Sequence, residues 1–571
     1  MKSYVFDIEA DALINTVVRV WAIVLKDTET NEMFSYYGDS LGVGINKIQE
    51  ADVLIGHNII CYDIPVLEKL YGIKIKAKIY DTLLLSRMMW PEIALTADSK
   101  KKYHIPSNLI GSYSLEAFGY RLGHFKLKHT DWTEWTPMMQ EYCEQDVNVN
   151  YRLWKLIQEK LPSEQSIHIE TKFQQYIHEQ EQHGVYFDTD KALLLQTPLQ
   201  QRINEITKQL VEIIPAKKIQ LKKSVKYQEF NPGSRQQIIQ FLCEKYDWKP
   251  TVFTDKGNAQ LSEEILEALP YHETKLFSEF FKTQKLLAML SDGDKSWLKF
   301  VKDGKIHGRV VTIGAVTGRC THSSPNLAQI PSPRAFMGKE VRELFYAPAG
   351  YKMIGTDASG LELRCFAHYL HTYDGGSYAN EVQFGDIHTR NQIAAGLDTR
   401  DDAKTFIYAL LYGAGDAKLG SIKGSGTQEQ LKQLGFTMRH SFMAKVPAYK
   451  NLVNNVKLAI QSRGKQLVGI DGRILQIRHE HAALNTLLQN AGAVAVKLAT
   501  VNFADNMKSR GIEFNPCLHI HDEWEVYTKD SDAEITKQIA VESIKQAGEE
   551  LNFKCPLTGE SRSGQTWYEV H

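Results

Sequence analysis

The pattern of apolar residues changes twice along the chain, which predicts several domains rather than one. Residues 1 to about 160 combine β-rich apolar runs with helical patterns, which is typical of an α/β domain. Long amphipathic helices follow to about residue 300, and then come short strands, a mostly helical block and a closing hairpin. The 571 residues also exceed the roughly 250 to 300 at which single cores stop growing. We therefore expect a multidomain α/β and α+β protein.

The composition excludes several classes of protein. With 43% hydrophobic and 24% charged residues, the chain has neither a disordered nor a fibrous composition. The net charge of −1 means that any phosphate-binding surface must be local. The seven cysteines include no C-x-x-C pair, which argues against a zinc site and a disulfide framework. No apolar run is long enough to cross a membrane, so we expect a cytoplasmic protein with no membrane contact.

An acidic face is predicted at the start of the chain. Asp7 and Glu9 lie two residues apart in a strand-like run, so both carboxylates point to one side and Phe6 and Ile8 to the other. Such a pair is common on surface strands and carries little weight alone. A third carboxylate, Asp63, follows a second predicted strand end that leads into a helix.

A helix predicted over 137–160 adds a fourth carboxylate. Tyr142 and Asp146 are four residues apart and therefore share one helical face. Four carboxylates in one site repel one another unless divalent cations neutralise them, and oxygen ligands suit Mg²⁺ or Mn²⁺. Two such ions can activate a water molecule and stabilise the leaving oxyanion in phosphodiester hydrolysis.

A second acidic pair lies far along the chain. Asp357 ends a predicted strand, and Glu362 lies one turn inside the helix that follows. Much later, His521, Asp522 and Glu523 occupy the turn of a predicted hairpin whose strands carry alternating apolar residues. Asp357 and Asp522 would meet if these strands belong to one sheet.

A helix between these segments carries a polar stripe with a particular order. The stripe repeats every four residues, and its members are Arg400, Lys404, Tyr408 and Tyr412. Two cations followed by two tyrosines suit a nucleoside triphosphate, because the cations meet the phosphates and the rings lie near the base.

A second stripe with the same step follows on a later helix. Its members are His481, Asn485 and Gln489. Amide side chains in such a stripe can read base edges in the minor groove, where acceptors are common to all base pairs. An enzyme that must ignore sequence needs this kind of contact.

Taken together, these segments resemble two known families. The first 160 residues resemble the proofreading exonucleases of the DnaQ-like, ribonuclease-H-like superfamily, whose three motifs match Asp7 with Glu9, Asp63, and Tyr142 with Asp146. The remainder resembles family A, the DNA polymerase I-like polymerases. The sequences of its motifs look closest to those of the replicative polymerases of T-seven-like podophages. That match also runs through Thr317-Gly318-Arg319 and Asp471-Gly472-Arg473.

The resemblance implies a fold and a domain order. A ribonuclease-H-like 3′–5′ exonuclease domain would be followed by a right-hand polymerase of thumb, palm and fingers. The implied boundaries are 1–160 for the exonuclease, 161–300 for the thumb, 301–369 and 492–571 for the palm, and 370–491 for the fingers.

The resemblance also implies metal ligands and catalytic residues. Two Mg²⁺ ions per active site are expected, and Mn²⁺ would substitute. In the polymerase site the ligands would be Asp357, Asp522 and the backbone of Ala358, with Glu523 beside them. In the exonuclease site Asp7, Glu9, Asp63 and Asp146 would hold the ions, and Tyr142 would orient the attacking water.

Roles in substrate binding follow from the same resemblance. The expected triphosphate ligands are His388, Arg400 and Lys404, with Lys404 protonating the departing pyrophosphate. Tyr408 would lie by the sugar, Tyr412 near the templating base, and Glu362 against the 2′ side of the sugar. The expected contacts to DNA are Arg319, Arg334, His481, Asn485, Gln489 and His521.

The expected partners are primer–template DNA and deoxynucleoside triphosphates, with a phage helicase–primase and a single-strand-binding protein beside them. Thioredoxin is not expected, because the long thumb insertion that binds it in the coliphage relative is replaced here by the short stretch 215–230. We expect a monomer. Three alternatives stay open: a nuclease with an inactive polymerase half, a non-catalytic DNA-binding subunit, and an RNA polymerase.

Overall fold

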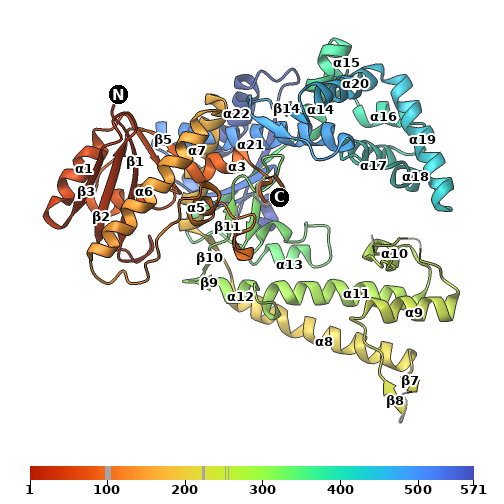
Figure 1. The fold of residues 1–571 in the computed structure, drawn as a ribbon. Coiled ribbons are helices and arrows are strands. Elements are labelled where there is room, and N and C mark those ends of the chain that lie inside the picture. The colour runs from red at the N-terminus through yellow and green to blue at the C-terminus, as the bar shows by residue number, and fades with distance from the viewer. Residues whose placement is uncertain (97–104, 221–224, 251, 255) are drawn as a thin grey trace. The chain divides into compact units, whose positions relative to one another are not determined.

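The computed structural model describes all 571 residues except 97–104, 221–224, 251 and 255 (Figure 1). The chain forms two compact units, each built from separate stretches of sequence. The first unit comprises residues 1–183, 310–321 and 354–563. The second comprises residues 184–309, 322–353 and 564–571. Both acidic regions of the sequence lie in the first unit.

The N-terminal part of the first unit is a mixed five-stranded sheet in the order β3-β2-β1-β4-β5. β1 pairs antiparallel with β2 and parallel with β4, and β4 pairs parallel with β5. The strands are β1 (Ser3–Ala10), β2 (Val20–Asp27), β3 (Met33–Tyr37), β4 (Val53–Gly56) and β5 (Lys78–Asp81). The helices are α1 (Leu41–Gln49), α2 (Asp63–Tyr71), α3 (Thr82–Met89), α4 (Ile93–Thr96), α5 (Leu115–Leu122) and α6 (Pro137–Gln158).

The two faces of β1 belong to different cores. Phe6 and Ile8 pack with residues of α1 and α2 on one side. Val5 lies on the other side in a core with Cys143 and Val147 of α6. The alternation predicted for this strand is therefore confirmed, and it leaves Asp7 and Glu9 on the α6 side.

A four-stranded sheet in the order β16-β17-β13-β18 lies at the centre of the remaining first unit. Its strands are β13 (Tyr351–Ala358), β16 (Phe514–Ile520), β17 (Glu523–Lys529) and β18 (Gly559–Gly564). The predicted hairpin is β16 with β17, an antiparallel pair. Its neighbours include α7 (Glu164–His183), which contacts β16 and α21 (Ala483–Ser509), and α22 (Ala533–Glu550), which contacts β17 and α21.

A helical block fills the sequence between β13 and α21. Its helices are α14 (Leu361–Asp374), α15 (Ser377–Phe384), α16 (Ile387–Ala395), α17 (Arg400–Leu411), α18 (Asp416–Lys423), α19 (Gln428–Lys445) and α20 (Pro447–Ser462). A short hairpin, β14 (Gln466–Val468) with β15 (Ile474–Gln476), follows it, and two further strands, β11 (Arg309–Val311) and β12 (Thr321–Ser323), pair with each other. Phe406, Ile407 and Leu410 of α17 are buried, as the stripe pattern predicts.

The second unit is mainly helical. Its helices are α8 (Thr189–Ile213), α9 (Arg235–Tyr246), α10 (Glu263–Ala268), α11 (His272–Leu287), α12 (Trp297–Phe300), α13 (Gly338–Arg342) and α23 (Trp567–Val570). Its short strands are β6 (Val185–Tyr186), β7 (Lys217–Gln220), β8 (Val225–Gln228), β9 (Val301–Lys302) and β10 (Lys305–Ile306). Of the helices that the structure describes in either unit, none is long and apolar enough to cross a membrane.

Candidate active sites

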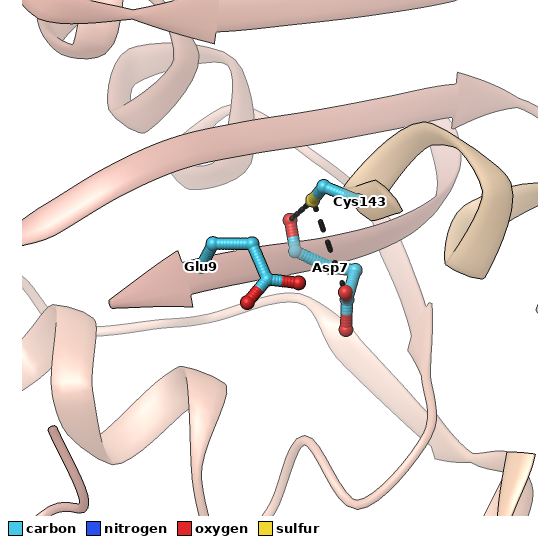
Figure 2. Close-up of side chains that lie close together, drawn as sticks. All are labelled: Asp7, Glu9 and Cys143. Carbon is cyan, nitrogen blue, oxygen red and sulfur yellow. Dashed lines mark hydrogen bonds between the residues drawn. The ribbon is translucent and has the colours of Figure 1, made fainter. Parts of the chain in front are cut away.

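The first site gathers around the acidic face of β1. Oxygen atoms of Asp7 and Glu9 and the sulfur of Cys143 all lie within 4.8 Å of one another. Figure 2 shows both carboxylates projecting from one strand, with Cys143 of the neighbouring helix beside Asp7. Burial raises the pKa of the Cys143 thiol. The thiol therefore stays protonated, and its Sγ lies 3.7 Å from the Asp7 carbonyl oxygen and 3.8 Å from Asp7 Oδ2.

Two further carboxylates complete this first site. Asp63 is the first residue of α2, and its Oδ1 accepts a 3.1 Å hydrogen bond from the backbone N–H of Ile8. Asp146 projects from α6 and is buried. Both carboxylates raise the pKa of Asp7. The structure thus brings together all four acids that the sequence predicts.

The acids of this site are shielded from water and close to one another, and both conditions favour their neutral forms. Burial is the largest cause of the pKa shift of each acid. It raises the pKa of Glu9 to about 7, of Asp63 to about 8 and of Asp146 to about 6. The pKa of Asp7 is also raised well above its usual range, by burial first and then by the charges of Asp63 and Glu9.

This donor set fits a divalent cation. Asp146 Oδ1 is buried and has no hydrogen-bond partner in the described part of the chain. A buried carboxylate oxygen without a partner costs free energy, and a cation would remove that cost. Hard carboxylate oxygens are the ligands that Mg²⁺ and Mn²⁺ prefer.

Two residues that the sequence did not point to also reach this site. Lys126 Nζ lies 2.5 Å from Asp146 Oδ2 and 4.7 Å from the centre of the Tyr142 ring. Trp132 Nε1–H donates a 3.0 Å hydrogen bond to Glu9 Oε2. Both residues lie in the segment between α5 and α6, which has no periodic pattern that could have identified them.

The second site lies where β13 meets the β16–β17 turn. The backbone N–H of Ala358, next to Asp357, donates a 3.1 Å hydrogen bond to the carbonyl oxygen of Asp522. His521 adopts a left-handed backbone conformation in the turn, with φ of 58°. Such a conformation is unfavourable for a residue with a side chain and is characteristic of functional turns. The two predicted aspartates therefore belong to adjacent backbone segments.

Other acids of this second site influence Asp522. Burial, followed by the charge of Glu362, raises the pKa of Asp522 to about 6. Glu523 is buried at the start of β17, and it also raises the pKa of Asp522. Asp357 is exposed. The oxygens of two carboxylates at one sheet edge again fit a divalent cation.

Glu362 links the second site to an aromatic and a cationic residue. The hydroxyl of Tyr412 donates a 2.9 Å hydrogen bond to Glu362 Oε1. Arg319 Nη2 lies 3.9 Å from the same oxygen. Burial first, and then the Glu362 charge, raises the pKa of Tyr408 to about 12, with smaller effects from Asp522 and Asp357. The tyrosines of the α17 stripe thus lie beside the acids.

The cations of the stripe lie at the other end of α17. Arg400 Nε lies 3.1 Å from Asp386 Oδ2, and the same carboxylate accepts hydrogen bonds from the first backbone N–H groups of α16. Burial lowers the pKa of His388, and the nearby charges of Arg400 and Lys404 lower it further. Arg400 and Lys404 of α17 therefore lie close enough to His388 of α16 for their charges to act on its imidazole.

Comparisons with known proteins show the family to which the chain belongs. A model of DNA polymerase family A matches residues 199–569. The chain belongs to DNA polymerase family A. The DNA-directed DNA polymerase of Escherichia phage T7 is 32% identical over 709 aligned residues, which cover 99% of this chain and all of that protein. That of Enterobacteria phage T3 is also 32% identical, with the same coverage.

A solved structure supports the fold of this family A polymerase. The POL domain of Pol1 from M. smegmatis, in complex with DNA primer–template and dNTP, superposes with a TM-score of 0.77. The match covers 99% of this chain and 96% of that chain, at 17% identity. As a family member, the chain is a DNA-directed DNA polymerase, and the family uses divalent metal ions.

The second predicted stripe of the polymerase begins before its helix. His481 lies in a 3₁₀ turn (Glu480–Ala482), where it stacks on His479, while Asn485 and Gln489 lie on α21. The helix that the sequence predicts for all three thus starts two residues after His481. Arg334 belongs to the second unit.

Beside this stripe, the polymerase contains a buried charge network that the sequence did not reveal. Glu170 is fully buried and accepts hydrogen bonds from Lys497 Nζ at 2.8 Å and 2.9 Å. Arg473 Nη1 lies 2.7 Å from Glu170, and Arg473 Nη2 lies 2.6 Å from Asp471. The single lysine in the apolar run of α21 is the signal that could have indicated a buried partner.

This network lies directly behind Arg319. A Cβ atom on Gly318, whose φ is 79°, would lie 2.9 Å from Arg473 Nη1. Only glycine permits both that backbone conformation and that close approach. The Asn490 side-chain amide, next to Gln489, donates a 3.1 Å hydrogen bond to the carbonyl oxygen of Thr317. Arg473 of the network and Asn490 of α21 therefore both lie against the backbone that precedes Arg319.

Proposed function

We propose that this polymerase carries two active sites, one that extends a DNA primer and one that removes nucleotides from its 3′ end. The observation that supports the proposal is the presence of two separate acidic sites in one chain. Each gathers carboxylates from distant parts of the sequence, and each fits divalent cations. The exonuclease site comes from β1, α2 and α6, and the polymerase site from β13 and the β16–β17 turn.

In the polymerase site, Asp357, Asp522 and the backbone carbonyl of Ala358 would hold two Mg²⁺ ions, for which Mn²⁺ can substitute. When bound, these ions would favour deprotonation of the primer 3′-hydroxyl and stabilise charge on the α-phosphate. Glu523 supports the turn from its buried position at the start of β17.

Arg400 and Lys404 of α17, together with His388 of α16, would bind the triphosphate. Arg400 and His388 would contact its oxygens, and Lys404 would protonate the departing pyrophosphate as a general acid. The proximity of these three residues supports this assignment.

The tyrosines and Glu362 would define the nucleoside pocket. Glu362 would exclude a ribose 2′-hydroxyl, which favours deoxynucleotides and separates the enzyme from RNA polymerases. Tyr408 would lie by the sugar and Tyr412 near the templating base. The hydrogen bond between Tyr412 and Glu362 supports a shared location.

The polymerase would also bind primer–template DNA. The proposed contacts are Arg319, Arg334, His481, Asn485, Gln489 and His521. The similar POL domain of M. smegmatis was solved with DNA primer–template and dNTP, which is consistent with this substrate. Arg319 and Gln489 adjoin the buried network described above, which would hold them in place for the nascent base pair.

In the exonuclease site, Asp7, Glu9, Asp63 and Asp146 would hold the ions, and Tyr142 would orient the water that attacks the terminal phosphodiester. The unpartnered Asp146 Oδ1 supports a metal-binding role. This site would lie in an exonuclease domain of residues 1–160. The thumb (161–300), palm (301–369 and 492–571) and fingers (370–491) would follow.

The partners of the enzyme would be those of phage replication in the host cytoplasm, namely a helicase–primase and a single-strand-binding protein. We propose a monomer that does not use thioredoxin. The segment 215–230 supports this because it is short, and its described residues include the strands β7 and β8. Extension lengths that increase on adding thioredoxin would contradict it.

Primer extension tests the main proposal. Purified enzyme should extend a primed DNA template with deoxynucleotides and Mg²⁺, and should shorten a 3′-labelled single strand when nucleotides are omitted. Asp522→Ala should abolish extension and leave degradation unchanged. Extension with ribonucleotides only would indicate an RNA polymerase, and degradation without extension would indicate a nuclease. Neither activity would indicate a non-catalytic DNA-binding subunit.

A further inference from the structure

The ammonium group of Lys126 lies inside the acidic cluster of the proposed exonuclease site. Its side chain is 22% exposed, and its Nζ lies 2.5 Å from Asp146 Oδ2. The ring of Tyr142 is close by, with its centre 4.7 Å away. Both residues that Lys126 contacts are therefore ones to which the proposed function assigns a role.

The charge of Lys126 reaches beyond these two contacts. It lowers the pKa values of Asp7 and Glu9 as well as that of Asp146, and so opposes the effect of burial. A single cation thus partly compensates a group of four shielded acids.

The residue before Lys126 is fixed by a hydrogen bond to α6. Gln145, next to Asp146 on α6, donates a 2.8 Å hydrogen bond from its side-chain amide to the carbonyl oxygen of Phe125. The backbone before Lys126 is thereby fastened to the helix that carries Asp146. The hydrogen bond from Gln145 to Phe125 therefore helps to hold Lys126 close to Asp146.

The two oxygens of Asp146 are used differently. Oδ2 contacts Lys126, whereas Oδ1 is buried without a partner in the described part of the chain. A divalent cation that binds Asp146 must share the carboxylate with an ammonium group or replace it. Two cations on one carboxylate repel each other strongly at such distances.

We propose that Lys126 is a built-in counter-ion of the exonuclease site, which neutralises Asp146 when no metal is bound and competes with the divalent ion for that carboxylate. This inference rests on the proposed exonuclease function. It makes Lys126 a positioning residue that sets the metal concentration at which the site fills.

Direct metal binding tests this competition. Mn²⁺ binding is measured by electron paramagnetic resonance in full-length protein that carries Asp357→Asn and Asp522→Asn, so that the polymerase site does not contribute. Lys126→Met should tighten Mn²⁺ binding by roughly tenfold or more, because a repelling charge is removed at short range. Lys126→Arg retains the charge and should leave the affinity close to that of the parent protein. Lys128→Met is the matched control, because Lys128 is an exposed lysine of the same segment.

Thermal unfolding gives a second readout. Without divalent ions, Lys126→Met should unfold at a lower temperature than the parent, because the acids lose their counter-ion. Added Mn²⁺ should then stabilise the Met variant more than the parent. A purely structural role would lower the unfolding temperature equally with and without Mn²⁺, and would overturn the proposal. If Lys126→Met folds in neither condition, the same measurements are made on Lys126→Gln.

The outcomes separate this inference from the function on which it rests. Unchanged Mn²⁺ affinity in both neutral variants of Lys126 would overturn the counter-ion role while leaving the exonuclease intact. If the parent protein binds no Mn²⁺ that Asp7→Asn removes, then the metal site itself is absent and the proposed exonuclease fails. A lower exonuclease kcat with unchanged Mn²⁺ affinity would assign Lys126 to the substrate instead of the metal.

Discussion

The two acidic sites of this polymerase differ in how far their carboxylates are shielded from water. In the N-terminal site, Glu9, Asp63 and Asp146 are all buried, and a lysine lies among them. In the second site, Asp357 is exposed at a strand end, and the cations lie on separate helices. A shielded group of acids is assembled before any substrate arrives. A site with one exposed and one partly buried aspartate can instead be completed by a nucleotide that brings its own charge.

The largest effect should come from removing one ligand from either site. Asp522→Asn is expected to lower primer extension by at least about 10³-fold, because several kcal/mol of charge stabilisation are lost. Exonuclease activity on single-stranded DNA should stay unchanged. Steady-state extension and 3′-end degradation, measured on the same preparation, check this.

The reciprocal substitution is the control for that separation. Asp7→Asn should lower degradation to a similar extent and leave extension intact. If either substitution abolished both activities, then the two sites would not act independently, and the comparison between them would fail.

The next effect concerns the cations that only the second site uses. Lys404→Ala should lower the maximal rate of extension by about 10²-fold, because a general acid typically contributes that much. Single-turnover incorporation of one nucleotide measures it, and Lys404→Arg should recover part of the rate. Degradation without nucleotides should not change. An unchanged single-turnover rate would show that Lys404 has no part in catalysis.

A smaller effect is expected at the sugar. A tyrosine hydroxyl at position 408 can substitute for a missing 3′-hydroxyl, so Tyr408→Phe should discriminate against dideoxynucleotides about tenfold more strongly, as expected for one hydrogen bond. Competition between deoxy- and dideoxynucleotides during extension measures the ratio. Equal ratios for the parent and the variant would refute the assignment of Tyr408 to the sugar.

The smallest effect concerns stability in the absence of metal. Asp7→Asn should raise the free energy of unfolding by at least about 1 kcal/mol in chelator at neutral pH, because an acid whose pKa is raised in the folded state destabilises that state. Asp357→Asn should have little effect, because Asp357 is exposed. Denaturant unfolding in chelator compares the two variants. A destabilised Asp7→Asn protein would contradict the view that the first site is held together against repulsion.

Local sequence patterns predicted much of the molecule. The alternation in β1, the four-residue step on α6 and the stripe on α17 each follow from the geometry of one element, and the structure contains all three. The first strand needed no tertiary information, because burial of Phe6 and Ile8 on one side leaves Asp7 and Glu9 on the other. Fold class and family followed from the same motifs.

Contacts between distant segments could not be predicted in this way. Glu170 lies on α7, Lys497 on α21, and Asp471 with Arg473 in the turn between β14 and β15, and no short pattern relates these three segments. His481 was assigned to the helix of Asn485, yet the structure places it in a 3₁₀ turn. A helix boundary depends on local capping and packing as much as on the periodicity of its side chains.

The sequence by itself determined which residue types are present and which face of a strand or helix they share. Periodicity is a property of the backbone, so it survives without knowledge of the fold. Only the tertiary structure decided which carboxylates share a site, that Lys126 reaches Asp146, and that Ala358 is bonded to the backbone of Asp522. Charge acts over a few ångströms in space, and distance along the chain does not measure it.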